Sequence, residues 1–432
     1  MTNPPEQVPA LVVVDSRNMW GETRRQYGVG AQVDVAGIAP ALAPYGFDVV
    51  HSYIGLATES GSKRPSARLT QALDVNRRYA EEVERSGLAT VLNGRLAERN
   101  RELEEKLVDV LCAIQIARSA HDIVSGRTSA RAIVVMSEDM DLIPAYKFAQ
   151  DLGVPVFASA CATVDTRPDA SWLLLTEPTL RQMTRRPRGR LAGTELRAQL
   201  ARWLSSPTKY RMTFTVVADE GARIRLSHNS GAIGYWHDAP ASADRRPSAK
   251  HDLWVTGVEP CSSERDFPLL AVSHSPGHTS AWPPRGLLEG TVTRWTAPTR
   301  LQVDLGAAGT RSCSAVAGSY MPGNRVLVHE DRSRSQSAWR LVGRLDEPRA
   351  TPGWASPAAP RLARCLSSAD SPGASTRAVL LDDEAEVALQ PPGRDVPKDG
   401  DIYAVVPIAH LPQADGSLRV VTVAVTSGLG IG

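Results

Sequence analysis

The chain has 432 residues, which is too many for one ordinary hydrophobic core and predicts two to four domains. The 49 basic and 47 acidic residues leave a net charge of only +2, so any binding of nucleic acid must use local patches rather than a global field. The five cysteines are isolated and form no C-x-x-C pair, which argues against a zinc ribbon and against a disulfide framework.

The N-terminal segment lacks the basic and apolar parts of a signal peptide. No apolar stretch approaches the ~20 residues that a membrane-spanning helix needs. We therefore expect a cytoplasmic protein that does not enter a membrane.

The first 180 residues alternate between strand-like and helix-like patterns. The expected strands are 11–14, 47–53, 89–92, 132–136 and 154–158, and the expected helices are 66–86, 98–120 and 141–152. The run AIVVM at 132–136 has no polar alternation, which is typical of a parallel strand covered on both faces. This order predicts an α/β domain over residues 8–180, with an open parallel sheet flanked by helices.

The region after residue 180 is rich in proline, glycine and short β-branched runs. Residues 181–206 are interpreted as a basic linker followed by a short helix at 194–204. Three weakly similar β-rich units are then expected at 207–272, 286–346 and 373–427. Short, evenly spaced strands of this kind predict small barrels, similar to OB or S1 domains.

Acidic residues follow two of the predicted strands. Asp15 comes directly after the run LVVV, and Asp139 and Asp141 follow IVVM through Ser137 and Glu138. Chain segments that leave the carboxyl ends of neighbouring parallel strands line one crevice, so these carboxylates are expected to lie together. Each acid taken alone could instead cap a helix or form a turn.

A further acidic residue lies in an apolar helical pattern. Asp109 is the only formal charge in LVDVLCAIQIA (107–117), and we expect it to be buried. A buried carboxylate needs a basic partner, such as Arg17 or Lys147, or a bound cation. One hard divalent ion, Mg²⁺ or Mn²⁺, would account for all of these acids together, and we favour this interpretation.

These segments together resemble a known family. The succession VVVDSRN (12–18), EKLVDV on a helix (105–110), IVVMSEDMDLIP (133–144) and GVPV (153–156) resembles the NYN branch of the PIN-like nucleases over roughly residues 10–180. The resemblance implies a metal-dependent endoribonuclease, a hydrolase of RNA phosphodiester bonds. It also implies that Mg²⁺ or Mn²⁺ is held by the catalytic residues Asp15, Asp109, Asp139 and Asp141, with Asn18 and Ser137 in supporting positions.

One position departs from the family pattern. Members commonly carry another Asp six residues after the helical one, where this chain has Gln115. Six residues rotate a helix by about 240°, so Gln115 is not expected to share the face of Asp109. A catalytically weak or inactive PIN-like RNA-binding protein is therefore the alternative.

Two other enzyme classes fit less well. A haloacid-dehalogenase-type phosphatase needs a second Asp two residues after the first, where this chain has Arg17. A topoisomerase-primase-type domain expects Glu at the position of Asp15. Both are discounted.

Basic and aromatic residues outside the acidic group are candidates for contacts with RNA, which we expect to be single-stranded. The basic candidates are Arg17, Arg24, Arg25, Lys63 and Arg64 in the α/β domain, and Arg185, Arg186, Arg188 and Arg190 in the linker. In the β-rich units, Trp254, Trp295 and Trp339 could stack on bases, although tryptophan in a small β domain more often belongs to the core.

Overall fold

In the computed structural model, the apolar runs before Asp15 and Ser137 form neighbouring strands of one sheet. β1 (Val8–Asp15) lies between β3 (Phe47–Ser60) and β6 (Ala132–Met136), and it is parallel to both. All five residues of β6 are buried, as expected for a parallel strand covered on both faces.

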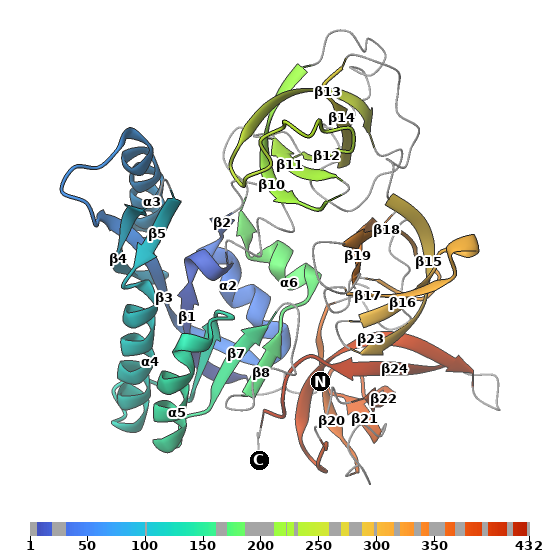
Figure 1. Cartoon of the computed structure of the whole chain (residues 1–432). Helices are drawn as coiled ribbons and strands as arrows, with labels where there is room; N and C mark the ends of the chain where they lie inside the picture. Colours follow the sequence, from blue (N-terminus) through green and yellow to red (C-terminus); the bar gives the residue numbers. More distant parts are fainter. Residues whose placement is uncertain are drawn as a thin grey trace. The chain divides into compact units, whose positions relative to one another are not determined.

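The structure describes residues 7–19, 32–99, 102–160, 171–185, 211–221, 223–228, 232–258, 269–275, 287–297, 300–314, 320–331, 338–344, 359–367, 376–390, 396–412 and 418–429. Two compact units are present, and each is described by itself (Figure 1). The first comprises residues 1–22, 33–184 and 358–432, and the second comprises residues 23–32 and 185–357.

The sheet of the first unit has seven strands in the order β5-β4-β3-β1-β6-β7-β8. β4 (Ala89–Arg99), β7 (Val156–Ala160) and β8 (Ser171–Leu174) continue the parallel pattern on the two sides. β5 (Glu102–Lys106) is an antiparallel edge strand. The prediction of an α/β domain with an open, largely parallel sheet is confirmed.

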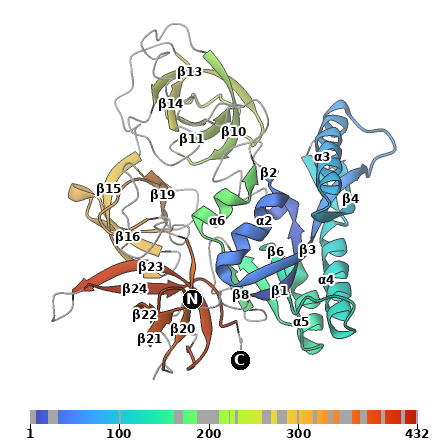
Figure 2. The same cartoon turned by 180° about the vertical axis from the view of Figure 1, so that it is seen from behind.

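Helices cover this sheet. The helices of the first unit are α2 (Val35–Leu42), α3 (Ala67–Ser86), α4 (Val108–Val124), α5 (Ile143–Asp151) and α6 (Glu177–Gln182), with the 3₁₀ turns η1 (Ala43–Tyr45) and η2 (Met140–Leu142). α3, α4 and α5 contribute Leu73, Ile116 and Tyr146 to one buried cluster with Val13 of β1, so they share a face of the sheet. α2 and α6 lie in front of the sheet when it is seen from behind (Figure 2).

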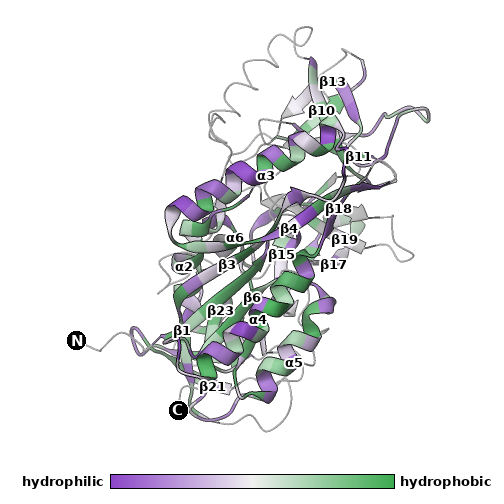
Figure 3. Cartoon of the chain, turned by 90° about the vertical axis from the view of Figure 1, so that its left-hand side faces the viewer, coloured by the Kyte–Doolittle hydropathy of each residue, from purple (hydrophilic) through white to green (hydrophobic). Residues whose placement is uncertain are grey.

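The helix predicted at 66–86 is confirmed as α3. Its first turn is capped by Ser66, whose hydroxyl oxygen accepts a hydrogen bond from the Leu69 backbone amide at 3.1 Å. Gly87 ends the helix in the left-handed conformation, with φ of 69°. Hydrophilic residues alternate with apolar ones along α3 (Figure 3), as expected for a helix with one face in solvent.

The prediction of one helix over residues 98–120 is wrong at its N-terminal end. Residues 102–106 form β5, and α4 begins only at Val108. Leu107 between them has a left-handed backbone with φ of 71°, which reverses the chain. The sequence ELEEK favours a helix, but pairing with the edge of β4 overrides that preference, with Leu103 opposite Glu98.

Each β-rich unit is a closed five-stranded barrel, so the prediction of small barrels is confirmed. In each barrel the strands run in the spatial order 1-2-3-5-4, and the third and fifth are parallel. The first barrel contains β10 (Arg211–Asp219), β11 (Ile224–His228), β12 (Ile233–Trp236), β13 (Lys250–Val258) and β14 (Leu269–Ser273). The second contains β15 (Leu287–Ala297), β16 (Arg300–Asp304), β17 (Thr310–Ser314), β18 (Arg325–Asp331) and β19 (Ala338–Arg344), with η4 (Gly306–Ala308).

The third barrel contains β20 (Arg361–Cys365), β21 (Thr376–Leu380), β22 (Glu386–Gln390), β23 (Ile402–Pro412) and β24 (Leu418–Ala424). It begins at Arg361, not at residue 373 as predicted, because the Pro- and Ser-rich surroundings conceal the short strand RLARC. The helix predicted at 194–204 lies outside the described residues.

The third barrel joins the edge of the α/β sheet within the first unit. The Leu174 amide donates to the Val425 carbonyl at 2.7 Å, and the Ser427 amide donates to the Trp172 carbonyl at 3.1 Å. The segment after β24 therefore pairs with β8 and extends the sheet. A short two-stranded sheet of β2 (Gln32–Val33) and β9 (Thr184–Arg185) completes the described elements.

None of the helices in the described ranges combines the length and apolar character needed to cross a lipid bilayer.

Candidate metal centre

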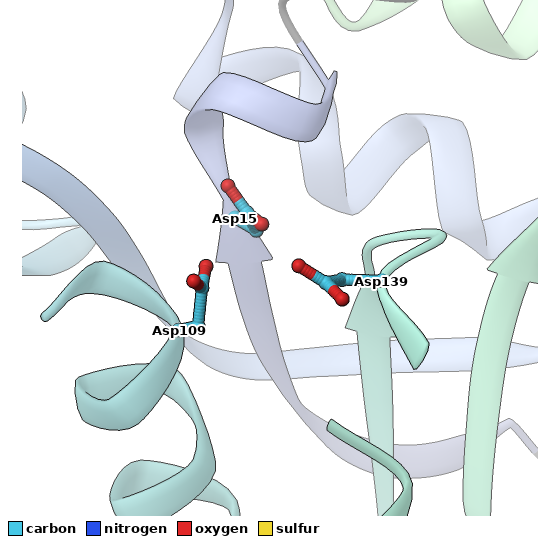
Figure 4. A group of neighbouring side chains, drawn as sticks. All are labelled: Asp15, Asp109 and Asp139. Atoms are coloured by element: carbon cyan, nitrogen blue, oxygen red, sulfur yellow. The ribbon is translucent and has the colours of Figure 1, made fainter. Parts of the chain in front are cut away.

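Three carboxylates meet at the carboxyl-end edge of the sheet. Asp15 is the last residue of β1, Asp139 follows β6, and Asp109 lies in the first turn of α4. One carboxylate oxygen from each lies within 4.8 Å of the other two, and the three side chains point toward a common region (Figure 4). We call these three residues the acidic triad.

The topology explains why these residues meet. The chain leaves β1 toward β3 and β4 on one side, and it returns through α4 to β6 on the other side. β1 and β6 therefore flank the point where the order of strands reverses, which is where open α/β sheets bind ligands. Asp15 and Asp139 leave the sheet on either side of this point, and α4 carries Asp109 to it.

Asp15 is the buried member of the triad, with 4% of its surface exposed. Its Oδ1 accepts hydrogen bonds from the backbone amides of Arg17 and Asn18, both at 3.1 Å. Its Oδ2 accepts a hydrogen bond from the Ser137 hydroxyl at 3.3 Å. Oδ1 of Asp15 therefore caps the backbone that follows β1, as the helix-cap interpretation expects. Capping does not explain why Asp109 and Asp139 lie close to Asp15.

Ser137 and Asn18 connect the loops that carry Asp15 and Asp139. The Ser137 hydroxyl oxygen also accepts a hydrogen bond from the Asp139 backbone amide at 3.1 Å. The Asn18 side-chain oxygen accepts a hydrogen bond from the Glu138 backbone amide at 3.0 Å. These bonds hold the loops after β1 and β6 in one arrangement beside the acidic triad.

Asp141 does not join the triad. It is exposed in η2, and its backbone amide donates to Oδ1 of Asp139 at 2.9 Å. Its charge is near enough to contribute to a raised pKa of Asp109. The structure therefore brings together three of the four predicted carboxylates and leaves Asp141 beside them.

The expectation that Asp109 is buried is wrong. Its residue is exposed, because α4 begins one residue before it and the apolar segment that seemed to enclose it lies further along the helix. A carboxylate in the first turn is favoured by the helix dipole. Asp15 is the more deeply buried of the two, and Asp109 is only partly desolvated.

Two glycines in the sheet lie against the first turns of α4, and sequence analysis did not identify them. A Cβ at Gly55 of β3 would lie 2.6 Å from the Cys112 sulfur, and one at Gly94 of β4 would lie 2.5 Å from a Val108 methyl. Only glycine at these positions lets the first turn of α4 pack closely against the sheet. A glycine inside a predicted strand was the available signal, because it often marks such a close approach.

Burial and neighbouring carboxylates raise the pKa values of two members of the triad. Burial, and secondarily the charges of Asp109 and Asp139, raise the pKa of Asp15, although hydrogen bonds from Asn18 and Ser137 oppose this. Burial and the charges of Asp139 and Asp141 likewise raise the pKa of Asp109, and Arg17 partly offsets this. In the part of the chain that the structure describes, neither Arg17 nor Lys147 forms an ion pair with Asp109.

This donor set fits a hard divalent cation. Carboxylate oxygens are the preferred ligands of Mg²⁺ and Mn²⁺, and such ions keep several water ligands when few protein groups bind them. One side of the triad is buried and hydrogen-bonded, and the other side, at Asp109, is exposed. A cation would also remove the repulsion that raises the pKa values of Asp15 and Asp109.

Gln115 lies within the body of α4. It is buried, and its Nε2 donates to the Ser119 hydroxyl oxygen at 3.3 Å. It therefore has a structural hydrogen bond of its own along the helix.

Only some of the basic residues predicted to contact RNA lie in the described part of the chain. Arg17 donates from a terminal nitrogen to the Leu103 carbonyl at 3.3 Å, beside the triad. Lys63 and Arg64 are exposed after β3. Arg185 donates to the Gln32 side-chain oxygen at 3.1 Å, in the short sheet of β2 and β9. Arg24, Arg25, Arg186, Arg188 and Arg190 lie outside the described residues.

The three tryptophans differ. Trp339 packs against the core of the second barrel, and the Arg311 guanidinium lies 5.7 Å from its ring centre, which favours the core interpretation. Trp254 is half-buried on β13 and is not part of the buried core cluster of the first barrel. The side chain of Trp295 lies outside the described residues.

Comparisons with known proteins add little. No model of a protein family matches the chain, and the search of curated proteins finds no match. A protein of unknown function from Vibrio parahaemolyticus is similar in structure over 41% of this chain and 90% of its own, with 16% identity and a TM-score of 0.25. A multidomain protein with nucleic acid binding domains from Streptococcus pneumoniae covers 49% and 72%, with 10% identity and a TM-score of 0.13. An oxidoreductase from Sinorhizobium meliloti covers 72% and 78%, with 10% identity and a TM-score of 0.21. Similarities this low support no conclusion about function.

Proposed function

We propose that the protein is a metal-dependent endoribonuclease of the PIN-like kind. The observation that carries the proposal is the acidic triad. In it three carboxylates from separate elements converge at the point where the strand order reverses, and no described base forms an ion pair with them. The NYN resemblance of residues 10–180 supports the same reading of these residues.

Asp15, Asp109 and Asp139 would hold one Mg²⁺ or Mn²⁺ ion. When bound, such an ion supplies Lewis-acid activation of water and offsets the charge of the scissile phosphate. Asp15 is fixed by three hydrogen bonds, and Ser137 holds Asp139 relative to it. These bonds preorganise the carboxylates before substrate arrives, which lowers the reorganisation needed during the reaction.

In this proposal an exposed carboxylate also acts as the general base. No histidine belongs to the triad, so a carboxylate is the available general base. Asp141 is exposed beside the triad, and it accepts the proton of the attacking water. Arg17 lies on the same side, near Asp109, and guides the phosphate backbone of RNA toward the carboxylates.

The barrels would supply affinity for single-stranded RNA. Their closed five-stranded form and the strand order 1-2-3-5-4 fit OB- or S1-like domains, which bind single strands through a basic surface and stacking aromatic residues. Trp254 is the best candidate for stacking, since it lies outside the core cluster of its barrel.

The alternative function is RNA binding without efficient cleavage. The neutral, buried side chain of Gln115 favours it, because related proteins commonly have a carboxylate there. The two functions differ in whether bound RNA is cut.

The test is cleavage of labelled single-stranded RNA by purified protein with Mn²⁺ or Mg²⁺, beside an EDTA control. Asp139→Asn should abolish cleavage, whereas Asp151→Asn, which removes an exposed carboxylate at the end of α5, should leave it unchanged. Equal cleavage by wild type and Asp139→Asn would rule out this site. Binding without cleavage by wild type would establish the alternative.

A further inference from the structure

The first barrel contains a buried arginine whose hydrogen bonds are incomplete. Arg223 lies in the tight hairpin between β10 and β11 and is 3% exposed. Its Nε donates to Oε2 of Glu220 at 2.7 Å. Its two terminal nitrogens, Nη1 and Nη2, have no hydrogen-bond partner in the described part of the chain. Buried polar groups almost always find a partner, so these nitrogens need an explanation.

A second arginine shares the same carboxylate. Arg225 Nε lies 3.6 Å from Oε1 of Glu220 and, like the terminal nitrogens of Arg223, makes no hydrogen bond. Among the described residues, two guanidinium groups therefore flank one carboxylate, and their positive charges outnumber its negative charge by one. An ion-pair cluster with only a structural role would be expected to balance its charge and satisfy its donors.

An aromatic ring holds the guanidinium of Arg223 in place. The Cζ atom of Arg223 lies 4.7 Å from the centre of the Tyr235 ring, within the range of a cation–π contact. Tyr235 of β12 is directly opposite Arg225 of β11, so the two side chains leave the same face of the sheet. Stacking and the bond to Glu220 fix the guanidinium plane, and the edge with Nη1 and Nη2 stays unbonded.

That edge is suited to an oxyanion. The paired N–H groups of a guanidinium match two oxygens of a carboxylate or a phosphate, and such bonds are strong because both partners are charged. A phosphate offers three terminal oxygens, so it can serve Arg223 and Arg225 together, whereas a carboxylate offers two. The excess positive charge and the number of unbonded donors favour phosphate.

We propose that Arg223, Arg225 and Tyr235 form a phosphate-binding site in the first barrel that takes the terminal phosphate of an RNA strand. An internal phosphodiester continues into chain on both sides and needs an open groove, whereas a terminal phosphate is free on one side. The terminal nitrogens of Arg223 are covered in the free protein, so the groups that cover them must move when the phosphate enters. The RNA part of this inference rests on the proposed function. The phosphate site itself does not.

The test compares binding of two otherwise identical RNA oligonucleotides, one with a 5′-phosphate and one with a 5′-hydroxyl. Binding is measured by fluorescence anisotropy with a 3′-label and with EDTA present, so that cleavage plays no part. The phosphorylated strand should bind about tenfold more tightly, as expected for charge-assisted hydrogen bonds. Arg223→Gln should remove this preference. Arg246→Gln should keep it, because that residue is an exposed arginine of the same barrel paired with Asp244.

A second measurement covers the case in which Arg223→Gln does not fold. Arg225→Gln changes a less buried residue and should also reduce the preference. In wild-type protein, inorganic phosphate and a nucleoside monophosphate should raise the thermal unfolding temperature above that in chloride of equal ionic strength. Stabilisation by both, with no binding of either oligonucleotide, would assign the site to a free nucleotide and would count against the RNA function instead.

The phosphate site is wrong if both oligonucleotides bind equally and phosphate gives no more stabilisation than chloride. It is also wrong if both arginine variants fold and keep the preference for the 5′-phosphate. Cleavage of RNA by the acidic triad would be unaffected by either result, so the two proposals fail separately.

Discussion

The acidic triad of the first unit and the arginine pair of the first barrel are both charged clusters, but they are built differently. The triad combines residues 15, 109 and 139 from three separate elements, and all three carry the same charge. Glu220, Arg223 and Arg225 lie within one hairpin and carry opposite charges. Among the described residues no base forms an ion pair with the first cluster, and we propose that a cation binds there. In the second cluster two guanidinium groups share one carboxylate, and we propose that it binds an anion.

The largest effect is expected when a carboxylate is removed from the triad. Asp15→Asn should lower kcat for RNA cleavage by about a hundredfold to a thousandfold, comparable to the loss of one preorganised group that stabilises charge in a reaction. Single-turnover cleavage with saturating Mn²⁺ measures this, and circular dichroism checks the fold. Retention of more than half of the wild-type rate would contradict a role for Asp15.

The second prediction concerns stability. It tests whether the three acids bind a cation or are merely close together. Mn²⁺ at a hundred times its Kd should stabilise the wild-type protein by about 2.7 kcal/mol. Asp109→Asn should lose this effect and, without metal, should unfold at a higher temperature than wild type because one repelling charge is gone. Thermal unfolding with and without Mn²⁺ measures both. A metal effect of wild-type size in Asp109→Asn would exclude that residue as a ligand.

The third prediction tests whether the sheet positions α4. Gly55→Val would place side-chain atoms where Cys112 and Val108 now lie, and overpacking of this kind costs about 1–3 kcal/mol. The same change should weaken Mn²⁺ binding, since it displaces the turn that carries Asp109. Gly87→Ala is a useful control, because its Cβ would meet no atom within 4 Å and only the strain of its positive φ is added. If a folded Gly55→Val protein bound Mn²⁺ with unchanged affinity, Gly55 would have no role in positioning Asp109.

The smallest expected effect is on pH dependence. The pKa values of Asp15 and Asp109 are raised above their ordinary 3.8, mainly by burial. In the folded state these two groups therefore keep their protons to higher pH than in the unfolded chain. Without metal, their contribution to the free energy of unfolding falls as the pH rises from about 3.8 through the raised pKa values.

For Asp109 this slope should be below about 1 kcal/mol per pH unit, because the residue is exposed and partly screened. The difference between wild type and Asp109→Asn in urea unfolding at several pH values isolates it from the other carboxylates. A difference that does not change with pH would mean that Asp109 has an ordinary pKa.

Much of the α/β domain could be predicted because its signals are local. The buried run before Asp15, the strand at 132–136 and the capped helix at 66–86 each follow from residues close together in sequence. The start of α4 could not be predicted in this way. Residues 102–106 favour a helix by composition, and only the presence of β4 beside them makes them a strand.

The error about Asp109 has the same origin. An apolar neighbourhood in sequence suggested burial, but exposure depends on which turn of the helix faces the sheet, and Asp109 falls in the first turn. The residues of the phosphate site gave no sequence signal, because arginines in a hairpin are usually solvated. Their burial is visible only in the folded barrel.

Local patterns were enough to predict that acids follow the carboxyl ends of two buried strands and that small barrels come later, because periodicity and strand-end residues depend on neighbours along the chain. That carboxylate oxygens of Asp15, Asp109 and Asp139 lie within 4.8 Å of one another, with Asp141 outside this group, follows from the folded arrangement alone. Distances between elements depend on strand order, on helix position and on the small residues that allow close packing, and none of these is a property of a single segment.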